Sequence, residues 1–338
     1  MGINDKGEMF GVIGSGQKSS KKNRFSQQPD RETEHLALWE NGRTHDLGTL
    51  LGQDEDWCVP TAMNNRGEII GTFGPFAARP GDINPNAIHI FLWSNGRLHD
   101  LGSNGEAVGI NSEGQVIGEK TWPDGQHGFL YSRGAMQEVR NPLGSEYSEV
   151  KAINGKAQMV GVASGPSKRT GPQPNAIIHT FLWNNGAASE IRLPQHDGFS
   201  TYGGANAIND AGQAVINADD LDEAGAKSGL GATSRCYLWQ NGTVTDLGTL
   251  PGFSMNAVAI NNRGQIIGNA TKTGGYPQSN FTHPFLWQSG VLHDLNDLTD
   301  HKGAMLTHVL GLNNRGQIVG YGEGSGKHYS FLLTPVTK

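Results

Sequence analysis

A ten-residue hairpin motif recurs along the chain and limits the folds that the chain can adopt. Its fullest copy runs from Ala259 to Gly268 and reads Ala-Ile-Asn-Asn-Arg-Gly-Gln-Ile-Ile-Gly. Each copy combines a short apolar strand, an Asn that can cap its own turn, a Gly free to adopt positive φ, and β-branched residues. The motif therefore predicts a strand–turn–strand unit. The asparagine that opens the turn recurs at intervals of 43 to 60 residues, at Asn4, Asn64, Asn111, Asn154, Asn209, Asn261 and Asn313.

A second hairpin lies between successive copies of the first. It reads His-Ile-Phe-Leu-Trp-Ser-Asn-Gly from His89 to Gly96, and an Asp-Leu-Gly segment follows it and ends at Gly102. Asn-Gly between apolar residues is a strong hairpin signal, so each repeat is expected to hold four strands. Related segments begin at His35, His127, His179, Arg235 and His283, and a shortened copy lies near the end of the chain at Phe331-Leu332-Leu333.

The repeats predict an all-β fold, a β-propeller of seven four-stranded blades. The first and last blades are expected to be incomplete, because the sequence begins inside a first-strand motif and ends after a third strand. A six-bladed ring, in which the two terminal half-repeats merge, is the alternative. We expect one domain over residues 1–338, with repeats at about 1–50, 51–103, 104–141, 142–193, 194–250, 251–297 and 298–338.

Small residues recur just before the turn and indicate which strand lies innermost. The residue two positions before each turn asparagine is Gly2, Ala62, Gly109, Ala152, Ala207, Ala259 or Gly311. Only small side chains let neighbouring sheets approach closely at a propeller axis, so the first strand of each blade is expected to be innermost. The third-strand tryptophans are expected to pack between sheets, at Trp39, Trp93, Trp183, Trp239 and Trp287.

Composition argues against several classes of partner. A net charge of -6 and a pI near 6.0 give no basic patch, so nucleic acid is not an expected partner. No apolar run approaches the roughly 18 residues of a membrane helix, so no membrane span is expected. The sequence opens without a signal peptide, which fits a cytoplasmic protein or a mature form after removal of a leader. Cys58 and Cys236 lie in separate repeats and are expected to be buried free thiols.

The repeated segments resemble those of a known family. The series His-x-Phe-Leu-Trp, Asp-Leu-Gly-Thr-Leu and Ile-Asn-x-x-Gly-Gln-Ile-Ile-Gly is similar to the HAF repeat family of bacterial proteins, which are usually described as extracellular repeats. The resemblance covers almost the whole chain. It implies a propeller-like fold and an exported, extracellular protein, with a cytoplasmic location as the alternative. It brings no catalytic motif and therefore implies no active-site residue.

The expected strand order gives the ring two unlike rims. The turn rim carries the short, uniform turns that join first to second and third to fourth strands. The loop rim carries the remaining connections, which differ from repeat to repeat in length and sequence. Because a rigid scaffold can present unlike loops without loss of its fold, function is expected on the loop rim. We expect a small polar ligand or glycan to bind there, with a protein-interaction scaffold as an alternative.

The candidate binding residues lie where the repeats differ on the loop rim. Carboxylates and amides can take the hydroxyls of a sugar, and exposed aromatic rings can pack on its apolar faces. For the two tryptophans in this set, packing under a long loop is the alternative. The candidate ligand-binding residues are Asp56, Trp57, Thr72, Glu119, Trp122, Asn217, Asn256, Asn269 and Tyr321.

An enzyme that uses the propeller mouth for acid/base chemistry, of the lyase or isomerase class, is the second functional hypothesis. Its catalytic residues would be Glu119, His127, Tyr202 and His308. Glu119 is expected to lie nearest the central channel, since His127 starts a third strand further out. No cofactor motif is present, and no metal site is expected, because the recurrent histidines lie one per blade and cannot converge on one ion.

Overall fold

The computed structural model describes most of the chain, and it describes only strands, turns and short connections. The described residues are 2–18, 32–47, 56–75, 88–144, 147–165, 177–194, 202–220, 233–272, 282–300 and 304–336. None of the elements formed within these ranges is a helix. The described part of the chain accordingly has no helix able to cross a membrane.

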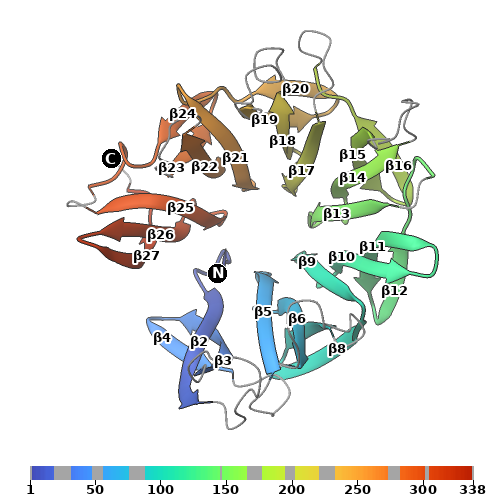
Figure 1. Ribbon diagram of the computed structural model, residues 1–338, viewed down its shortest axis with the longest axis horizontal. Helices are drawn as coiled ribbons and strands as arrows, with labels where there is room; N and C mark the ends of the chain where they lie inside the picture. The colour runs from blue at the N-terminus through green and yellow to red at the C-terminus, as the bar shows by residue number, and fades with distance from the viewer. Residues whose placement is uncertain are drawn as a thin grey trace, which may run out of the picture.

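Seven antiparallel sheets follow one another along the chain and are arranged in a ring (Figure 1). We call each sheet a blade. Blade 1 contains β1 (Gly2–Ile3), β2 (Met9–Lys18), β3 (Glu32–Glu40) and β4 (Arg43–Asp46), and blade 2 contains β5 (Asp56–Met63), β6 (Ile69–Pro75), β7 (His89–Ser94) and β8 (Arg97–Ser103). Blade 3 contains β9 (Gly105–Ile110), β10 (Val116–Trp122), β11 (Gly125–Ser132) and β12 (Ala135–Val139). Blade 4 contains β13 (Ser148–Ile153), β14 (Met159–Gly165), β15 (Ile177–Asn184) and β16 (Ala187–Ile191).

The remaining blades follow the same order. Blade 5 contains β17 (Tyr202–Ile208), β18 (Ala214–Asp220), β19 (Thr233–Gln240) and β20 (Thr243–Asp246). Blade 6 contains β21 (Phe253–Ile260), β22 (Ile266–Lys272), β23 (Thr282–Gln288) and β24 (Val291–Asp294). Blade 7 has three strands, β25 (Met305–Leu312), β26 (Ile318–Gly324) and β27 (Lys327–Leu333). The predicted seven-bladed β-propeller is confirmed, and the six-bladed alternative is wrong.

The two end blades differ from the expectation that both are incomplete. Blade 1 has all four strands, although β1 is only two residues long, whereas blade 7 lacks a fourth strand among the described residues. In each blade the strands are hydrogen-bonded in chain order, and Figure 1 shows β5, β9, β13, β17, β21 and β25 nearest the centre of the ring. The first strand of each of these blades is therefore innermost, as the small residues before the turns predicted.

The hairpin between first and second strands is held by its asparagine. In blade 6, Oδ1 of Asn261 accepts hydrogen bonds from the backbone N–H groups of Arg263 and Gln265, both at 3.0 Å. Gly264 then turns the chain with a φ of 75°. Blade 4 has Ala157 at this position, and it adopts the same left-handed conformation with a φ of 60°. The turn thus keeps its shape where the glycine is absent.

Neighbouring blades bury an apolar layer between them. Between blades 5 and 6, for example, Val215 and Cys236 pack with Met255 and Phe285, and all four are fully buried. The third-strand tryptophans pack against these layers, as Trp287 does here. Both cysteines are buried and outside any disulfide, as expected, and burial raises the pKa of Cys236 to about 12. The core is therefore divided into layers around the ring.

Candidate functional site at the mouth of the central channel

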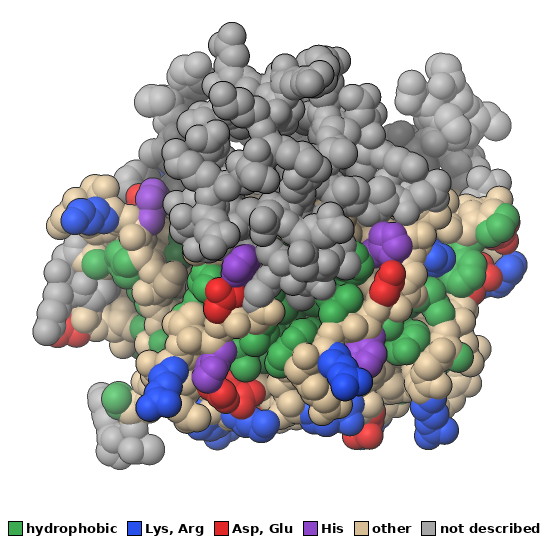
Figure 2. Space-filling model, turned by 90° about the horizontal axis from the view of Figure 1, so that it is seen from below, with side chains coloured by type: hydrophobic (Ala, Val, Ile, Leu, Met, Phe, Trp, Pro, Cys, Tyr) green, Lys and Arg blue, Asp and Glu red, His purple; other side chains and the backbone are tan. Residues whose placement is uncertain are grey.

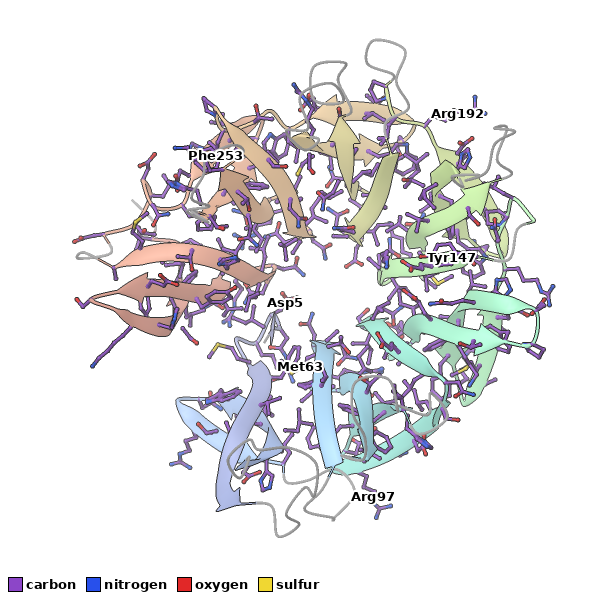
Figure 3. The ribbon with its side chains drawn as sticks, viewed as in Figure 1. Asp5, Met63, Arg97, Tyr147, Arg192 and Phe253 are labelled. Carbon is purple, nitrogen blue, oxygen red and sulfur yellow. The ribbon has the colours of Figure 1, made fainter. Side chains whose placement is uncertain are left out.

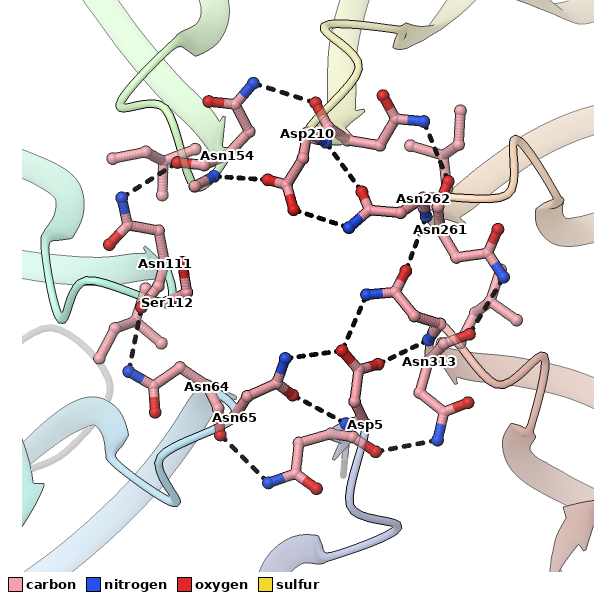
Figure 4. A pocket seen from close by; sticks show the side chains of 18 of the residues that line it. Asp5, Asn64, Asn65, Asn111, Ser112, Asn154, Asp210, Asn261, Asn262 and Asn313 are labelled. Carbon is pink, nitrogen blue, oxygen red and sulfur yellow. Dashed lines mark hydrogen bonds between the residues drawn. The ribbon is translucent and has the colours of Figure 1, made fainter.

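A closed ring of hydrogen bonds surrounds the axis on the turn rim (Figure 4). Nδ2 of each turn asparagine donates to the backbone carbonyl of the turn asparagine in the next blade, at 2.9 to 3.1 Å. The last of these bonds runs from Asn313 to Asn4 and joins the end of the chain to its beginning. Sequence reasoning gave this asparagine a role within its own hairpin only. The structure shows that it also connects the blades.

The next residue of each turn forms a second layer at the axis. Asp5 accepts hydrogen bonds from Asn65 and Asn314, and Asp210 accepts one from Asn262. Figure 3 shows Asp5 near the axis, in contrast to Arg97 and Arg192 at the periphery. The two layers line a cavity of about 190 Å³. Because these amides and carboxylates bond to one another, we interpret the residues that line this cavity as the structural contacts that close the ring.

The loop rim presents a different surface, built on cross-strand pairs. Each innermost strand from β5 to β25 has a β-bulge, where its register with the second strand shifts. Toward the loop rim from each bulge, one residue of the innermost strand faces the first residue after the repeated second-strand motif. These pairs are Val59 with Thr72, Glu106 with Glu119, Glu149 with Val162, Gly204 with Asn217, Asn256 with Asn269, and His308 with Tyr321. The mouth is therefore chemically different in each blade.

A cavity of about 590 Å³ lies at this mouth across blades 4 to 6, and we call it the amide cavity. Its polar lining comes from Asn206, Asn217, Ser234, Ser254, Asn256 and Thr271. Its apolar lining includes Val162, Ile178 and Met255. Among the described residues that line it, none has a charged side chain. The volume falls within the usual 300–1,000 Å³ of small-molecule sites.

Asn217 holds the wall of the amide cavity in place. Its Oδ1 accepts a hydrogen bond from the backbone N–H of Ala257 at 2.9 Å, and its Nδ2 donates to the carbonyl of Ala257 at 3.0 Å. Nδ2 also donates to Oδ1 of Asn256 at 2.6 Å. These bonds tie blade 5 to the bulge of β21 in blade 6 and fix the orientation of the Asn256 amide. The Nδ2 group of Asn256 remains without a hydrogen bond to any described residue.

Asn206 is the second open amide of this cavity. It is the extra residue at the bulge of β17, and its side chain is exposed. No hydrogen bond joins its amide to another residue of the described chain. The bulge position thus presents an unpaired amide beside the one that Asn217 orients.

A charged cluster lies between blades 3 and 4, next to the amide cavity. The Lys151 amine is 3.3 Å from Oε1 of Glu119 and forms a closer ion pair with Glu149. The hydroxyl of Tyr147 donates to Glu149, and Gln126 donates to Glu119 at 2.7 Å. Since Glu149 pairs across the sheet with Val162, the cluster borders the cavity wall.

The cluster alters the acidities of its members. Burial, followed by the charge of Glu149, raises the pKa of the Glu119 carboxyl despite the opposing charge of Lys151. Burial would lower the pKa of the Lys151 amine, but its bonds and charge interactions with Glu149 and Glu119 together raise it. Burial and the hydrogen bond to Glu149 raise the pKa of the Tyr147 phenol. At neutral pH the tyrosine and lysine therefore keep their protons.

The candidate residues of blade 7 form an aromatic pair instead. His308 stacks on Tyr321 with ring centroids 4.6 Å apart, and Tyr321 is 37% exposed. Burial lowers the pKa of His308, which keeps the imidazole neutral near pH 7. Glu119 contacts Lys151 of the neighbouring first strand. Its partners in the described chain are Lys151, Glu149 and Gln126, with neither Tyr202 nor His308 among them.

The other candidates have structural contacts or lie outside the described part. Thr72 is buried, and Asn269 bonds through both amide atoms to the backbone of Val309. Trp122 is partly buried and packs in the apolar layer between blades 2 and 3. The side chains of Asp56, Trp57 and Tyr202 are outside the described residues, although β5 and β17 begin at Asp56 and Tyr202.

The recurrent histidines pair within their own blades. Nδ1 of His35, His89 and His179 lies 2.7 to 2.9 Å from the acidic residue that is eleven positions later, and His283 makes the same bond to Asp294. Figure 2 shows histidine side chains beside acidic ones along the outer face of the ring. These four histidines link third to fourth strands. His127 has different surroundings.

Sequence reasoning missed Asn206, Tyr147, Glu149 and Lys151. A detectable signal existed for two of them, because Asn206 and Lys151 occupy the position three residues before a turn asparagine, where the bulge lies. That position holds Thr61, Val108, Lys151, Asn206, Val258 and Leu310 in successive blades. Unlike residues at this repeated position mark it as a variable position at the mouth.

Comparisons with known proteins identify the fold and no family. No family model matches the chain, and no curated protein matches it. The chain is similar to the β-propeller domain of the Trilobed protease from Pyrococcus furiosus, with a TM-score of 0.60, 12% identity, and 98% of this chain and 94% of that chain covered. It is also similar to Pyrococcus horikoshii acylaminoacyl peptidase, with a TM-score of 0.59, 11% identity and 98% of this chain covered. This chain spans 50% of that peptidase.

Weaker structural matches are described as a polysaccharide lyase, a gluconolactonase and a fungal lectin. Their TM-scores are below 0.5, and that degree of similarity identifies no function for this chain. The comparisons therefore support the propeller architecture and do not identify its function.

Proposed function

We propose that the protein is a ligand-binding propeller that recognises a neutral, hydroxyl-rich ligand, most simply a saccharide, in the amide cavity. The observation that carries this proposal is the pair of open amides. Asn206 and Asn256 face one cavity, and Asn217 orients Asn256 while leaving its NH₂ group free. Primary amides donate and accept hydrogen bonds without charge, which suits sugar hydroxyls.

The lining supports a neutral ligand over an ionic one. Hydroxyls of Ser254 and Thr271 add to the amides, and Val162 and Met255 supply apolar surface for the carbon face of a ring. Within the described part of the chain, no charged side chain lines the cavity. A cavity of about 590 Å³ has room for one or two sugar rings. Affinity at a single site of this kind is expected in the micromolar to millimolar range, about 4 to 8 kcal/mol.

A glycan array followed by calorimetry tests the proposal. Wild-type protein should retain a neutral glycan, and Asn206→Ala and Asn256→Ala should each weaken its binding by roughly tenfold, since each removes hydrogen bonds worth about 1 kcal/mol or more. Asn262→Ala provides a matched control, because Asn262 is an exposed asparagine on the opposite rim. Absence of any retained glycan, or equal losses in all three variants, would count against the proposal.

An enzyme acting at the same mouth is the second candidate, and the charged cluster favours it. A carboxyl with a raised pKa beside a lysine and a tyrosine provides the groups needed for acid/base chemistry. The cluster is largely paired within itself, which is why we rank binding first. Mass spectrometry of each retained glycan after incubation separates the two functions. Turnover by wild type that is lost in Glu119→Gln, with binding retained, would favour the enzyme.

We also propose that the protein is extracellular. The similarity of its repeats to the HAF repeat family fits an extracellular location, where glycans are abundant. A protein partner on the loop rim is the alternative occupant. Pull-down of a stoichiometric protein partner that is lost in Asn206→Ala, with no glycan retained on the array, would favour that alternative.

A further inference from the structure

Blade 3 departs from the histidine–carboxylate pairing found elsewhere in the ring. Blade 4 provides an internal comparison, because its third strand, β15, has a histidine at the same position as β11 of blade 3. There His179 bonds through Nδ1 to Oε1 of Glu190 at 2.7 Å, and Arg192 pairs with the other oxygen of Glu190 at 3.1 Å. Blade 3 has His127, Glu138 and Arg140 at the equivalent positions. The same residue types therefore allow a direct comparison of geometry.

His127 makes no such hydrogen bond. It is 5% exposed, and its Nδ1 is buried without a hydrogen-bond partner in the described chain. Its Nε2 instead faces two carboxylates, at 3.7 Å from Oδ1 of Asp124 and 3.8 Å from Oε1 of Glu138. Oε1 of Glu138 is likewise buried without a hydrogen bond to described residues. These distances are too long for hydrogen bonds, which end near 3.2 Å for N–H···O.

Arg140 accounts for the remaining carboxylate oxygens. Its guanidinium lies 3.4 Å from Oδ2 of Asp124 and 3.0 Å from Oε2 of Glu138. It thereby holds the outer oxygen of each carboxylate and leaves the inner oxygens directed at His127. Outer-sphere contacts of this kind orient metal-binding carboxylates in known sites.

The three inner atoms have the spacing of ligands around one ion. Nε2 of His127, one oxygen of Asp124 and one oxygen of Glu138 all lie within 4.8 Å of one another. Tetrahedral coordination at about 2.1 Å requires ligand atoms roughly 3.4 Å apart, a few tenths of an ångström less than the two measured nitrogen–oxygen distances. One imidazole and two carboxylates form a ligand set that suits Zn²⁺ and Mn²⁺.

We propose that Asp124, His127 and Glu138 bind a divalent transition-metal ion, Zn²⁺ first, at the loop-rim end of blade 3. The ion would join the turn between β10 and β11 to the outer strand β12. Blade 4 is not proposed to bind an ion in this way, since His179 is engaged with Glu190. Sequence reasoning considered histidines of different blades converging on one ion, and it did not consider one histidine with two carboxylates of its own blade.

Metal titration of the full chain, freed of metal with a chelator, tests this site. Isothermal calorimetry with ZnCl₂ should show one equivalent bound by wild type, and the protein should gain thermal stability with added Zn²⁺. Asp124→Asn should weaken binding by about tenfold or more, because a neutral amide is a poor ligand. The Asp124 side chain is 52% exposed, so this substitution should leave the fold intact. A parallel titration with MnCl₂ ranks the two ions.

His179→Ala is the matched control and should bind Zn²⁺ as wild type does. The proposal is overturned if wild type takes up no Zn²⁺ or Mn²⁺ at submillimolar concentration. It is also overturned if Asp124→Asn binds as tightly as wild type, or if His179→Ala loses as much affinity as Asp124→Asn, since the ion would then bind elsewhere.

Discussion

Single asparagines have three roles in this molecule. Asn261 caps its own hairpin and bonds to the next blade, Asn217 clamps the neighbouring bulge, and Asn206 has its amide open to solvent. The side chains are chemically identical, and position alone separates them. Asn261→Ala should therefore lower mainly the stability of the protein, whereas Asn206→Ala should weaken mainly ligand binding.

Asn261→Ala should destabilise the protein by about 2–4 kcal/mol. The substitution removes the bond from Nδ2 to the carbonyl of Asn313 at 3.0 Å, and that carbonyl then keeps only its bond from the Gly316 N–H within its own turn. It also removes the bonds within the hairpin. Urea unfolding measures the loss. Asn206→Ala should stay within about 0.5 kcal/mol of wild type, and equal losses in both variants would contradict the assigned roles.

Glu119 should make stability depend on pH in a defined direction. Its folded-state pKa is raised by burial and by Glu149, so the folded state holds this proton more tightly than the unfolded state does. Ionisation above the ordinary value of about 4.3 therefore costs the folded state stability, and the cost remains at neutral pH. Replacing Glu119 by glutamine removes this loss of stability.

The melting temperature of Glu119→Gln, relative to wild type, should consequently be higher at pH 7 than at pH 4. Thermal unfolding of both proteins at the two pH values gives this difference directly. A relative melting temperature that falls between pH 4 and pH 7 would show that Lys151 outweighs burial at this carboxyl.

At the scale of the strand, the close approach of first and second strands depends on glycine. A Cβ added to Gly268 would overlap the backbone oxygen of Asn256 and the ring of Phe285. Gly71, Gly118 and Gly320 face the same combination of first-strand backbone and third-strand Phe. The Gly that ends the second-strand motif therefore makes room for the aromatic layer.

Gly268→Ala should cost about 1–3 kcal/mol through overpacking. Gly204→Ala is the control, because its added Cβ would meet Val162 at an ordinary 3.4 Å. Denaturant unfolding should separate the two variants clearly. If Gly204→Ala lost as much stability as Gly268→Ala, general backbone effects would explain the result better than the contact with Phe285.

Strand pairing was largely predictable, because it depends on local chemistry. Asn-x-x-Gly and Asn-Gly turns lie between apolar strands, and the small residues Ala62 and Ala259 indicated which strand lies innermost. The bulge was not predicted, although the unlike residues at its repeated position, such as Lys151 and Asn206, were a signal that this position differs between blades. The partners of Glu119 were missed because one of them, Lys151, occupies that bulge position in the neighbouring blade.

At the scale of the whole molecule, the ring closes although blade 7 has three strands in the described part of the chain. Apolar layers join blades 1 to 7 in succession, and no such core cluster spans blades 7 and 1 within the described residues. Polar bonds act at that seam, from Asn313 to Asn4 and between Asn314 and Asp5. Ring closure depends on contacts between opposite ends of the chain, which repeat spacing could not reveal.

The two rims differ in the partners of their asparagine side chains. On the turn rim the amides bond to one another and close the ring. On the loop rim two amides stay open beside a cavity, and on this contrast we base the proposed function. Both rims carry Asn side chains, so a ligand that bound Asn amides without regard to their surroundings could bind at either rim.

The most direct test of this account is an NMR titration of protein labelled with ¹⁵N at asparagine side chains, using the glycan that the array retains. The NH₂ signals of Asn206 and Asn256, assigned by substitution, should shift with ligand while those of Asn262 and Asn314 do not. Shifts confined to the turn-rim asparagines, with Asn206 and Asn256 unchanged, would contradict it.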